Sequence, residues 1–328
     1  MVDAVAANSV VRLGLIGSGR MARTRVANIT EAPRARLVAV TSHNGETGSA
    51  LATEQGCAFV ASTEELLARD DLDAVIVATR NDSHGALALD SLRAGKHALV
   101  EYPLSLDADQ AEAAVHEAEL YGLTLRVGYD QQWRGPHAAV RDLIHRDGPP
   151  LEIAARIAWA GGARRSPFRN MDMGGAPALV KSYYLYALLD WLGPPSFVHN
   201  AVRYAGLDIE GYYAAAVQHI ALEYADTLAR VDWIVGPNAG SRRTVDLALV
   251  WPAHSVTSDG QDLTRRDATG EAPLPVAHAP WSEATRWGLE HFLDAIFDGA
   301  AAFPNANAAF AAATVRLSTT TQYESIGR

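Results

Sequence analysis

One cysteine, Cys57, is present among the 328 residues. A lone thiol excludes an internal disulfide bond and any metal or iron–sulfur site built from several cysteines, and it suits a reducing compartment. Basic residues are also scarce: 28 Lys and Arg face 38 Asp and Glu, so the formal net charge is −10. Because a negative field repels nucleic acid and anionic membrane surfaces, we expect neither as a partner.

Long apolar runs are missing as well. No stretch approaches the ~18 uncharged apolar residues that a membrane-spanning helix needs. Residues 1–9 lack the basic start and the apolar run of a signal peptide. The histidines show no HxxxH or HxH spacing with carboxylates nearby, so no metal site is expected. Together these absences predict a soluble, cytoplasmic protein.

The strongest local pattern lies near the start of the chain. Residues 11–16 form an apolar run of strand length, followed by glycines and a helical pattern. The spacing Gly17-x-Gly19-x-x-Ala22 is that of the dinucleotide fingerprint: Gly17 permits the turn, Gly19 lets backbone approach a pyrophosphate, and Ala22 lets the helix pack closely on the strand. The pyrophosphate would bind free N–H groups at the helix N-terminus. The residues expected to contact the dinucleotide here are Gly17, Ser18, Gly19, Arg20 and Met21.

Strand and helix patterns alternate up to about Tyr129. Several of the helices have start signals, such as the capping box Ser62-x-x-Glu65. This alternation predicts an α/β domain with a doubly wound parallel sheet, the Rossmann type. The expected strands are 12–16, 37–41, 58–60, 74–78, 98–101 and 125–128, and the expected helices are 20–30, 46–55, 63–69, 83–94 and 108–121.

Beyond Pro149-Pro150 the strand patterns are longer and follow one another with few helices. Polar and apolar residues alternate from Arg230 to Trp233, which is typical of a sheet with one face in solvent. The expected strands are 151–160, 196–204, 214–223, 227–234 and 244–251; the expected helices are 176–192, 282–298 and 306–322; residues 254–280 are turn-rich and show no clear pattern.

These patterns predict two domains. The first, residues 1–128, would bind the dinucleotide, and the second, residues 129–328, would be an α+β domain with an open, mostly antiparallel sheet. The C-terminal helices of the second domain could pack back on the first. An exposed sheet would be an apolar patch too large to leave in water, so a homodimer or homotetramer is expected.

Several motifs, in this order, resemble those of the glucose–fructose oxidoreductase/inositol dehydrogenase family. Besides the first turn, residues 77–84 (VATRNDSH) are similar to its VATPNxxH loop, residues 94–104 (AGKHALVEYPL) to its AGKHVLVEKPL signature, and residues 128–133 (GYDQQW) to its GYNxRW segment. The resemblance covers nearly the whole chain. It implies a Rossmann domain, a C-terminal α/β domain whose open sheet often forms a dimer face, and NAD(P)-dependent redox chemistry on a sugar, a cyclitol or a related small molecule.

The family's catalytic side chains are replaced here. Its EKP lysine lies by the nicotinamide and the substrate hydroxyl, and Tyr102 occupies that position. Its DxGxH motif, aligned on residues 191–193, falls on Val180, Ser182 and Tyr184, and a slip of one residue would bring Lys181 to the aspartate position. The catalytic lysine, aspartate and histidine of the common pattern are therefore absent.

Oxidation of a secondary alcohol needs a hydride acceptor at the carbinol carbon and a group that takes the hydroxyl proton. Tyr102 can take this proton if a nearby cation lowers its pKa from about 10. Lys181 is a candidate for that cation, because it lies three residues before Tyr184 on the expected helix. The alternative is that Tyr102 and Tyr184 are only aromatic walls of a site that lost its chemistry.

Two other functions therefore remain open beside the oxidoreductase. One is a non-redox lyase, hydrolase or cyclase on the same fold, and the other is a non-catalytic sensor that binds the dinucleotide.

Further site residues follow from position and from the resemblance. Asn81 and His84, in the loop that begins near Thr79, follow a strand end where ligands bind in such sheets, although His84 could equally have a packing role. Glu101 would contact the ribose or nicotinamide side of the cofactor, as the resemblance implies; otherwise it caps nearby backbone. Residues expected at the substrate, some of which could instead be core aromatics, are Tyr129, Gln131, Trp133, Arg169 and Tyr183.

The end of the second strand bears on the choice between NAD and NADP. Sheets that bind NAD usually place an acidic residue there for the ribose 2′-hydroxyl. Here Ser42 and His43 occupy this position, so no carboxylate repels a 2′-phosphate, and Ser42 with His43 or Arg20 could bind it. The pattern favours NADP over NAD.

Overall fold

The computed structural model describes residues 10–237, 239, 244–297 and 306–320. The chain divides into two compact units, Met1–Asp130 with Trp281–Ala312, and Gln131–Pro280 with Ala313–Arg328. The expected domain boundary, after residue 128, lies close to the first of these divisions. Residues 1–9, 298 and 321–322, on which parts of the expectations above rest, lie outside the described part of the chain. No helix within the described ranges is both long enough and apolar enough to cross a bilayer.

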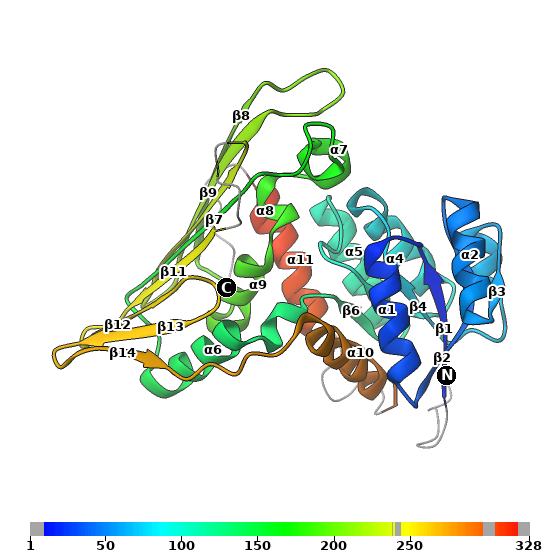
Figure 1. The fold of residues 1–328 in the computed structure, drawn as a ribbon, viewed down its shortest axis with the longest axis horizontal. Helices are drawn as coiled ribbons and strands as arrows, with labels where there is room; N and C mark the ends of the chain where they lie inside the picture. Colours follow the sequence, from blue (N-terminus) through cyan, green and yellow to red (C-terminus); the bar gives the residue numbers. More distant parts are fainter. Residues whose placement is uncertain (1–9, 238, 240–243, 298–305, 321–328) are drawn as a thin grey trace. The chain divides into compact units, whose positions relative to one another are not determined.

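Six parallel strands form the sheet of the first unit, in the order β3-β2-β1-β4-β5-β6 (Figure 1). This is the strand order of doubly wound dinucleotide-binding sheets, and it confirms the predicted fold class. The strands are β1 (Val11–Ile16), β2 (Ala35–Thr41), β3 (Ala58–Phe59), β4 (Ala74–Val77), β5 (His97–Val100) and β6 (Leu125–Val127).

Helices with capped ends connect these strands. Ser62 Oγ accepts from the Glu65 N–H at 3.1 Å, as the capping box predicts, and Asn44 Oδ1 accepts from the Thr47 N–H at 3.0 Å. The helices of this unit include α1 (Arg20–Glu31), α2 (Gly45–Gln55), α3 (Thr63–Leu67), η1 (Asn81–Ser83), α4 (His84–Arg93), α5 (Ala108–Leu120) and α10 (Trp281–Phe297).

Helix α10 comes from far along the chain and completes the core of the first unit. It packs against α1, and its buried side chains Leu289, Phe292 and Ile296 share one apolar cluster with Leu13 and Leu15 of β1. Burial of side chains of this size is the main stabilising contribution to such a unit.

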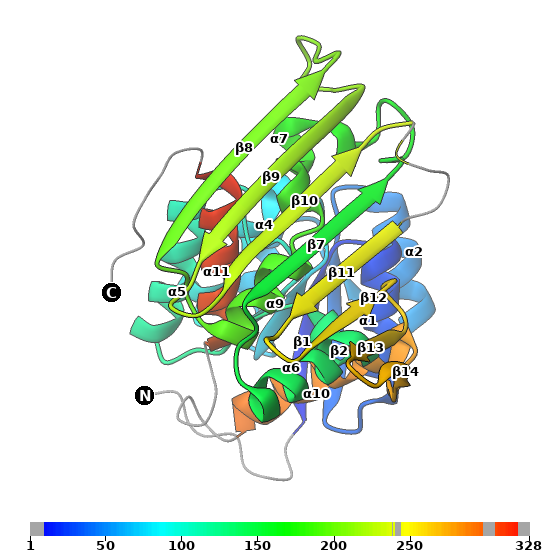
Figure 2. The same ribbon diagram turned by 90° about the vertical axis from the view of Figure 1, so that its left-hand side faces the viewer.

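Eight strands form the sheet of the second unit, in the order β14-β13-β12-β11-β7-β10-β9-β8, seen face-on in Figure 2. Strands β7 and β10 pair in parallel at its centre, and the other pairs run antiparallel, as predicted for an open, mostly antiparallel sheet. The strands are β7 (Glu152–Trp159), β8 (Phe197–Ala205), β9 (Ala215–Glu223), β10 (Leu228–Val235), β11 (Thr244–Val250), β12 (His254–Ser258), β13 (Leu263–Asp267) and β14 (Gly270–Leu274).

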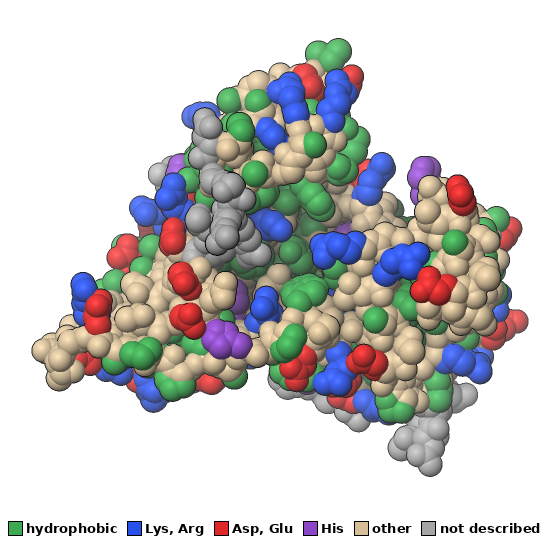
Figure 3. All heavy atoms as spheres, in the orientation of Figure 1, with side chains coloured by type: hydrophobic (Ala, Val, Ile, Leu, Met, Phe, Trp, Pro, Cys, Tyr) green, Lys and Arg blue, Asp and Glu red, His purple; other side chains and the backbone are tan. Residues whose placement is uncertain are grey.

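Side chains along the strands of this sheet are alternately buried and exposed, so one face of the sheet is buried and the other is open. In β9, Gln218, Ile220 and Leu222 are buried, whereas His219 and Ala221 are exposed. This confirms the prediction of one solvent-facing side. On the face viewed in Figure 3, basic and acidic side chains are interspersed rather than separated by sign.

The prediction of one continuous helix over residues 176–192 is wrong. The structure has α8 (Pro177–Val180) and α9 (Tyr183–Leu192), and Lys181 between them is non-helical, with φ −133° and ψ 53°. The Lys181 carbonyl accepts from the indole N–H of Trp233 at 2.9 Å. A buried indole donor requires an acceptor, and here it takes a carbonyl that a continuous helix would use itself. Lys181 and Tyr184 therefore do not lie on one uninterrupted helix.

Other parts of the second unit were not predicted either, among them a helix and a strand meander. Helix α6 (Gly135–Asp147) lies in a stretch for which no helix was expected. Residues 254–280 contain the meander β12-β13-β14, whose turns are closed by aspartates: Asp259 Oδ1 accepts from the N–H groups of Gln261 and Asp262. Polar turn chemistry of this kind makes short strands hard to recognise.

Candidate functional site

The fingerprint turn has the geometry that its glycines predict. Gly17 has φ +123°, and a Cβ atom there would lie 2.3 Å from the Ala78 carbonyl oxygen, so only glycine fits without strain. A Cβ atom on Gly19 would meet no atom within 4 Å. Gly19 is the N-cap of α1, and no side chain caps that end of the helix. Backbone N–H groups at an uncapped helix N-terminus can bind a pyrophosphate.

A cluster of three hydroxyl groups joins the ends of β1 and β2 to α2. Ser18 Oγ lies 2.8 Å from Ser42 Oγ and 2.7 Å from Thr47 Oγ1. The structure thus brings Ser18 and Ser42 together, next to the exposed His43; their contact with a cofactor stays a prediction. Sequence reasoning missed Thr47, which its place in the first turn of α2, after the N-cap Asn44, could have indicated.

The loop after β4 is tied to the loop after β5 through a buried histidine. His84 is 1% exposed, with Nδ1 2.8 Å from the Pro103 carbonyl oxygen and Nε2 3.4 Å from that of Thr79. Burial lowers the pKa of His84, so the ring is neutral and, on the shorter contact, we assign its proton to Nδ1. His84 therefore links two backbone segments, in line with the packing role considered above.

Thr79 and Asn81 lie in the same loop. Thr79 Oγ1 is 2.8 Å from Ser83 Oγ, and Asn81 begins η1. Both follow the carboxyl end of β4, the edge at which ligands bind in doubly wound sheets.

The segment that replaces the family's EKP motif follows β5. Glu101 is 6% exposed, and its Oε1 accepts from Arg25 Nε at 2.7 Å. The Tyr102–Pro103 peptide bond is cis. The ring of Tyr102 stacks on that of the buried Tyr129, with centroids 5.0 Å apart.

Sequence reasoning missed Arg25, a fully buried side chain of α1. Its position gave a signal, because it falls among the buried residues Ala22, Val26 and Ile29 on the apolar side of an amphipathic helix. A charged residue on such a side requires a buried partner of opposite charge.

The aromatic residues expected at the substrate in the second unit lie in a buried cluster. Tyr183 and Tyr184 are each 2% exposed. The His137 ring lies 5.1 Å from Tyr184, 6.1 Å from Tyr183 and 5.7 Å from Trp191, centroid to centroid. Gln131 and Trp133 belong to η2 (Asp130–Trp133) and are half-buried.

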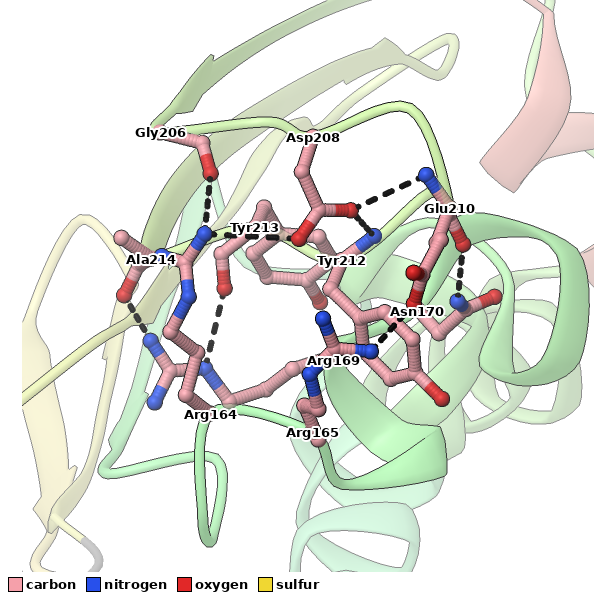
Figure 4. Close-up of polar contacts among 10 residues, drawn as sticks. All are labelled: Arg164, Arg165, Arg169, Asn170, Gly206, Asp208, Glu210, Tyr212, Tyr213 and Ala214. Carbon is pink, nitrogen blue, oxygen red and sulfur yellow. Dashed lines mark hydrogen bonds and ion pairs between the residues drawn. The ribbon is translucent and has the colours of Figure 1, made fainter.

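Arg169 connects two backbone segments of the second unit through hydrogen bonds, as drawn in Figure 4. It is 5% exposed, and its guanidinium donates to the carbonyl oxygens of Tyr213 (3.2 Å), Gly162 (3.3 Å) and Ala214. These donors hold the chain between β8 and β9 against the segment that follows β7. The neighbouring Arg164 reaches the Gly206 carbonyl at 3.3 Å.

The residues expected at the cofactor thus gather within the first unit, at the carboxyl ends of β1, β2, β4 and β5. Those expected to take part in catalysis or to contact the substrate are divided between the two units. Lys181, Tyr183, Tyr184 and Arg169 belong to the second unit, so their approach to Tyr102 stays a prediction.

Comparisons with known proteins agree with this architecture. A family model described as "Oxidoreductase family, NAD-binding Rossmann fold" matches residues 11–129. The 1,5-anhydro-D-fructose reductase of Ensifer adhaerens is 37% identical over 147 residues, 44% of each chain. The dTDP-3,4-didehydro-2,6-dideoxy-alpha-D-glucose 3-reductase of Streptomyces antibioticus is 31% identical over 201 residues, 58% of this chain and 60% of the other.

The chain therefore matches about half of the length of these curated relatives. A similar fold extends further: the biliverdin reductase of Synechocystis sp. PCC 6803, solved with biliverdin and NADP+, has a TM-score of 0.84 at 21% identity, over 94% of this chain and 96% of that one. Residues 11–129, with their motifs and the strand order of the first sheet, thus match the NAD-binding Rossmann part of the GFO/IDH/MocA oxidoreductase family.

Proposed function

We propose that this protein is an NAD(P)-dependent oxidoreductase that acts on a ketone or secondary alcohol of a sugar, a cyclitol or a related small molecule. The observation that carries the proposal is the uncapped N-terminus of α1 behind the turn at Gly17, which only glycine fits, together with polar residues at the carboxyl ends of four strands. The sugar substrates in the names of both relatives support the substrate class.

NADP is the proposed cofactor. The hydroxyl groups of Ser18, Ser42 and Thr47 form a cluster at the point where NAD-binding sheets place a carboxylate. Hydroxyl groups donate hydrogen bonds to phosphate oxygens without the repulsion that a carboxylate would exert. Such a cluster supports binding of a ribose 2′-phosphate.

Tyr102 is the proposed proton donor. It follows Glu101 at the carboxyl end of β5 and takes the place of the family's lysine, and a bound nicotinamide would supply the hydride. Lys181 or Tyr184 would assist by stabilising the phenolate. Because helix α9 starts only after Lys181, this assistance depends on the Lys181 side chain rather than on a shared helix face.

A second candidate substrate is a planar conjugated molecule. The side chain at position 102 is a half-buried aromatic ring, supported by the buried Tyr129, and an aromatic ring can stack on a conjugated ligand. Biliverdin, which the Synechocystis protein binds together with NADP+, is a molecule of this kind.

We also propose that the protein forms a homodimer or homotetramer through the open side of the second sheet. Along β9 this side presents His219 and Ala221, and His219 Nδ1 lies 2.7 Å from Asp232 Oδ1 of β10. Light scattering at micromolar concentration tests this, and a monomer would contradict it.

The deciding experiment is a fluorescence titration of the purified protein with NADPH and with NADH. We expect both to bind, with NADPH bound more tightly, and turnover to follow with a keto-sugar or cyclitol from a substrate panel. Biliverdin, added to the same panel, tests the second candidate. If neither nucleotide binds, the dinucleotide fold is only a scaffold, and a reaction without hydride transfer has to be sought.

A further inference from the structure

A buried guanidinium lies between two carboxylates in the first unit. Arg25 of α1 donates from Nε to Glu101 Oε1 and from Nη2 to Asp130 Oδ2, both at 2.7 Å, and from Nη1 to the Thr285 carbonyl of α10 at 3.1 Å. The Arg25 and Asp130 side chains are fully buried, and that of Glu101 is 8% exposed. One side chain thus connects α1, α10 and the chain segments after β5 and β6.

Stability alone does not explain this cluster. With both carboxylates ionised it holds one positive and two negative charges in a buried site, and burying charges is unfavourable even when they are paired. Although burial acts to lower it, the charges of Asp130 and Glu101 raise the pKa of Arg25, whereas burial raises the pKa of Asp130. Apolar residues of similar volume would often serve stability as well or better.

Two glycines provide the space that the cluster needs. A Cβ atom on Gly128 would lie 2.7 Å from Arg25 Nη2, and one on Gly288 would lie 2.1 Å from Asp130 Oδ1. Contacts this short would force the charged groups to move. The backbone on both sides is therefore compatible with the cluster only because these two positions lack side chains.

The three donor directions of Arg25 have distinct partners. Thr285 of α10 and Asp130, after β6, hold the guanidinium, and the Nε group donates to Glu101. This contact restricts Glu101 at the point where β5 ends. On its other side, His84 holds the Pro103 carbonyl at 2.8 Å, so the segment from Glu101 to Pro103 is fixed at both ends.

We propose that Arg25 is a positioning residue for the dinucleotide, holding the Glu101 carboxylate in the orientation that receives the nicotinamide half, with Asp130 as the anchor of Arg25. This rests on the proposed function and on the contact between Glu101 and the cofactor that the family resemblance implies. Arg25 itself is fully buried, so it would act on cofactor binding indirectly, through the orientation of Glu101.

The test compares two ligands on one variant. NADPH contains both halves of the dinucleotide, whereas ADP contains only adenosine and pyrophosphate. Lysine at position 25 keeps the positive charge but cannot donate in three fixed directions. We therefore expect Arg25→Lys to weaken NADPH binding about tenfold or more while ADP binding keeps its wild-type Kd.

Matched variants separate positioning from general damage. Arg23→Lys changes an exposed arginine of the same helix, paired with Glu54 at 3.0 Å, and should bind both ligands as the wild type does. Glu101→Gln should reproduce the selective loss of NADPH affinity. The double variant Arg25→Lys/Glu101→Gln should bind NADPH no more weakly than Glu101→Gln, because both changes remove the same interaction.

The outcomes are distinct. Equal losses of affinity for NADPH and ADP in Arg25→Lys, or unchanged NADPH affinity in that variant, would overturn the role of Arg25. Additive losses of NADPH affinity in the double variant would do the same. None of these results would contradict the proposed function. A wild-type protein that binds neither NADPH nor NADH would overturn the proposed function, and this role with it. If Arg25→Lys does not fold, Asp130→Asn decides, since it loosens the anchor: we expect a smaller loss confined to NADPH, and wild-type affinity for both ligands would contradict the proposal.

Discussion

The ring of Tyr102 stacks on the ring of Tyr129, with centroids 5.0 Å apart and planes 25° apart. Tyr129 is fully buried, so the stack gives Tyr102 a fixed support within the first unit. Offset or tilted ring pairs of this kind contribute about 0.5–1.5 kcal/mol beyond the area that they bury. A phenylalanine at position 102 would keep the stack and lose only the hydroxyl group.

Tyr102→Phe therefore tests the proton donor without disturbing the ring. If the hydroxyl transfers the proton, we expect kcat to fall by about 10²–10⁴-fold, with unchanged NADPH affinity. Steady-state kinetics with the substrate found in the panel, together with the NADPH titration, measure both quantities. A kcat near that of the wild type would show that Tyr102 lines the site without transferring the proton.

Alanine at the two fingerprint glycines should separate folding from binding. At Gly17 the positive φ and the Ala78 carbonyl at 2.3 Å from the added Cβ predict a loss of at least about 1–3 kcal/mol in the free energy of unfolding. At Gly19 the added Cβ meets no protein atom within 4 Å, so we expect wild-type stability but weaker NADPH binding, because the methyl group obstructs the pyrophosphate. Urea unfolding and the fluorescence titration measure the two effects, and equal stability losses would contradict this division.

Ser42→Asp should reverse the cofactor preference. A carboxylate at the end of β2 repels a 2′-phosphate and accepts from a ribose 2′-hydroxyl. We expect NADPH affinity to fall about tenfold or more while NADH affinity is kept or improved. Ser49→Asp adds the same charge at an exposed position of α2 and serves as the control. If both variants changed NADPH and NADH affinity equally, the effect would be due to the net charge of the protein and not to the position of the carboxylate.

Acid should destabilise the first unit through His97. Its Nδ1 accepts from the Thr124 N–H at 2.9 Å, and burial lowers the pKa of His97 to about 4. An unfolded chain binds this proton near pH 6.5, so between pH 6.5 and 4 the unfolded state holds more protons and stability falls as the pH falls. The loss should reach about 3 kcal/mol near pH 4.

Urea unfolding at pH 7.0, 5.5 and 4.5 measures this contribution. Asparagine at position 97 keeps an acceptor and does not titrate, so the pH dependence of His97→Asn should be shallower than that of the wild type. His116→Asn, at an exposed position, should leave the slope unchanged. Parallel slopes for the wild type and His97→Asn would exclude His97 as the source.

The doubly wound sheet could be predicted because its signals are local. The run from Val11 to Ile16 is apolar, its end is a glycine turn, and the capping residues Ser62 and Asp107 lie beside the helices that they cap. Each of these features depends on residues close together in the sequence. Pattern and spacing are sufficient for such elements.

Other features depend on distant residues. At the helix break the Lys181 carbonyl accepts from the indole of Trp233, 52 residues later, and a buried carboxylate that pairs with Arg25 belongs to Asp130, 105 residues away. No local pattern contains such information. Strands β12 to β14 were not predicted for another reason, since they are short and mostly polar, and only Val256, Ser258 and Leu263 in them are buried.

Helix α10 gives the first unit an unusual order of assembly. Its residues Leu289, Phe292 and Ile296 join the apolar cluster built on β1, but the ribosome adds them only after the entire segment Gln131–Pro280. A nascent or truncated chain ending at Asp130 would therefore expose the apolar surface of α1 that α10 covers. In terms of synthesis, the second sheet is an insertion within the first unit, and the core of the first unit becomes complete only after that sheet has been made.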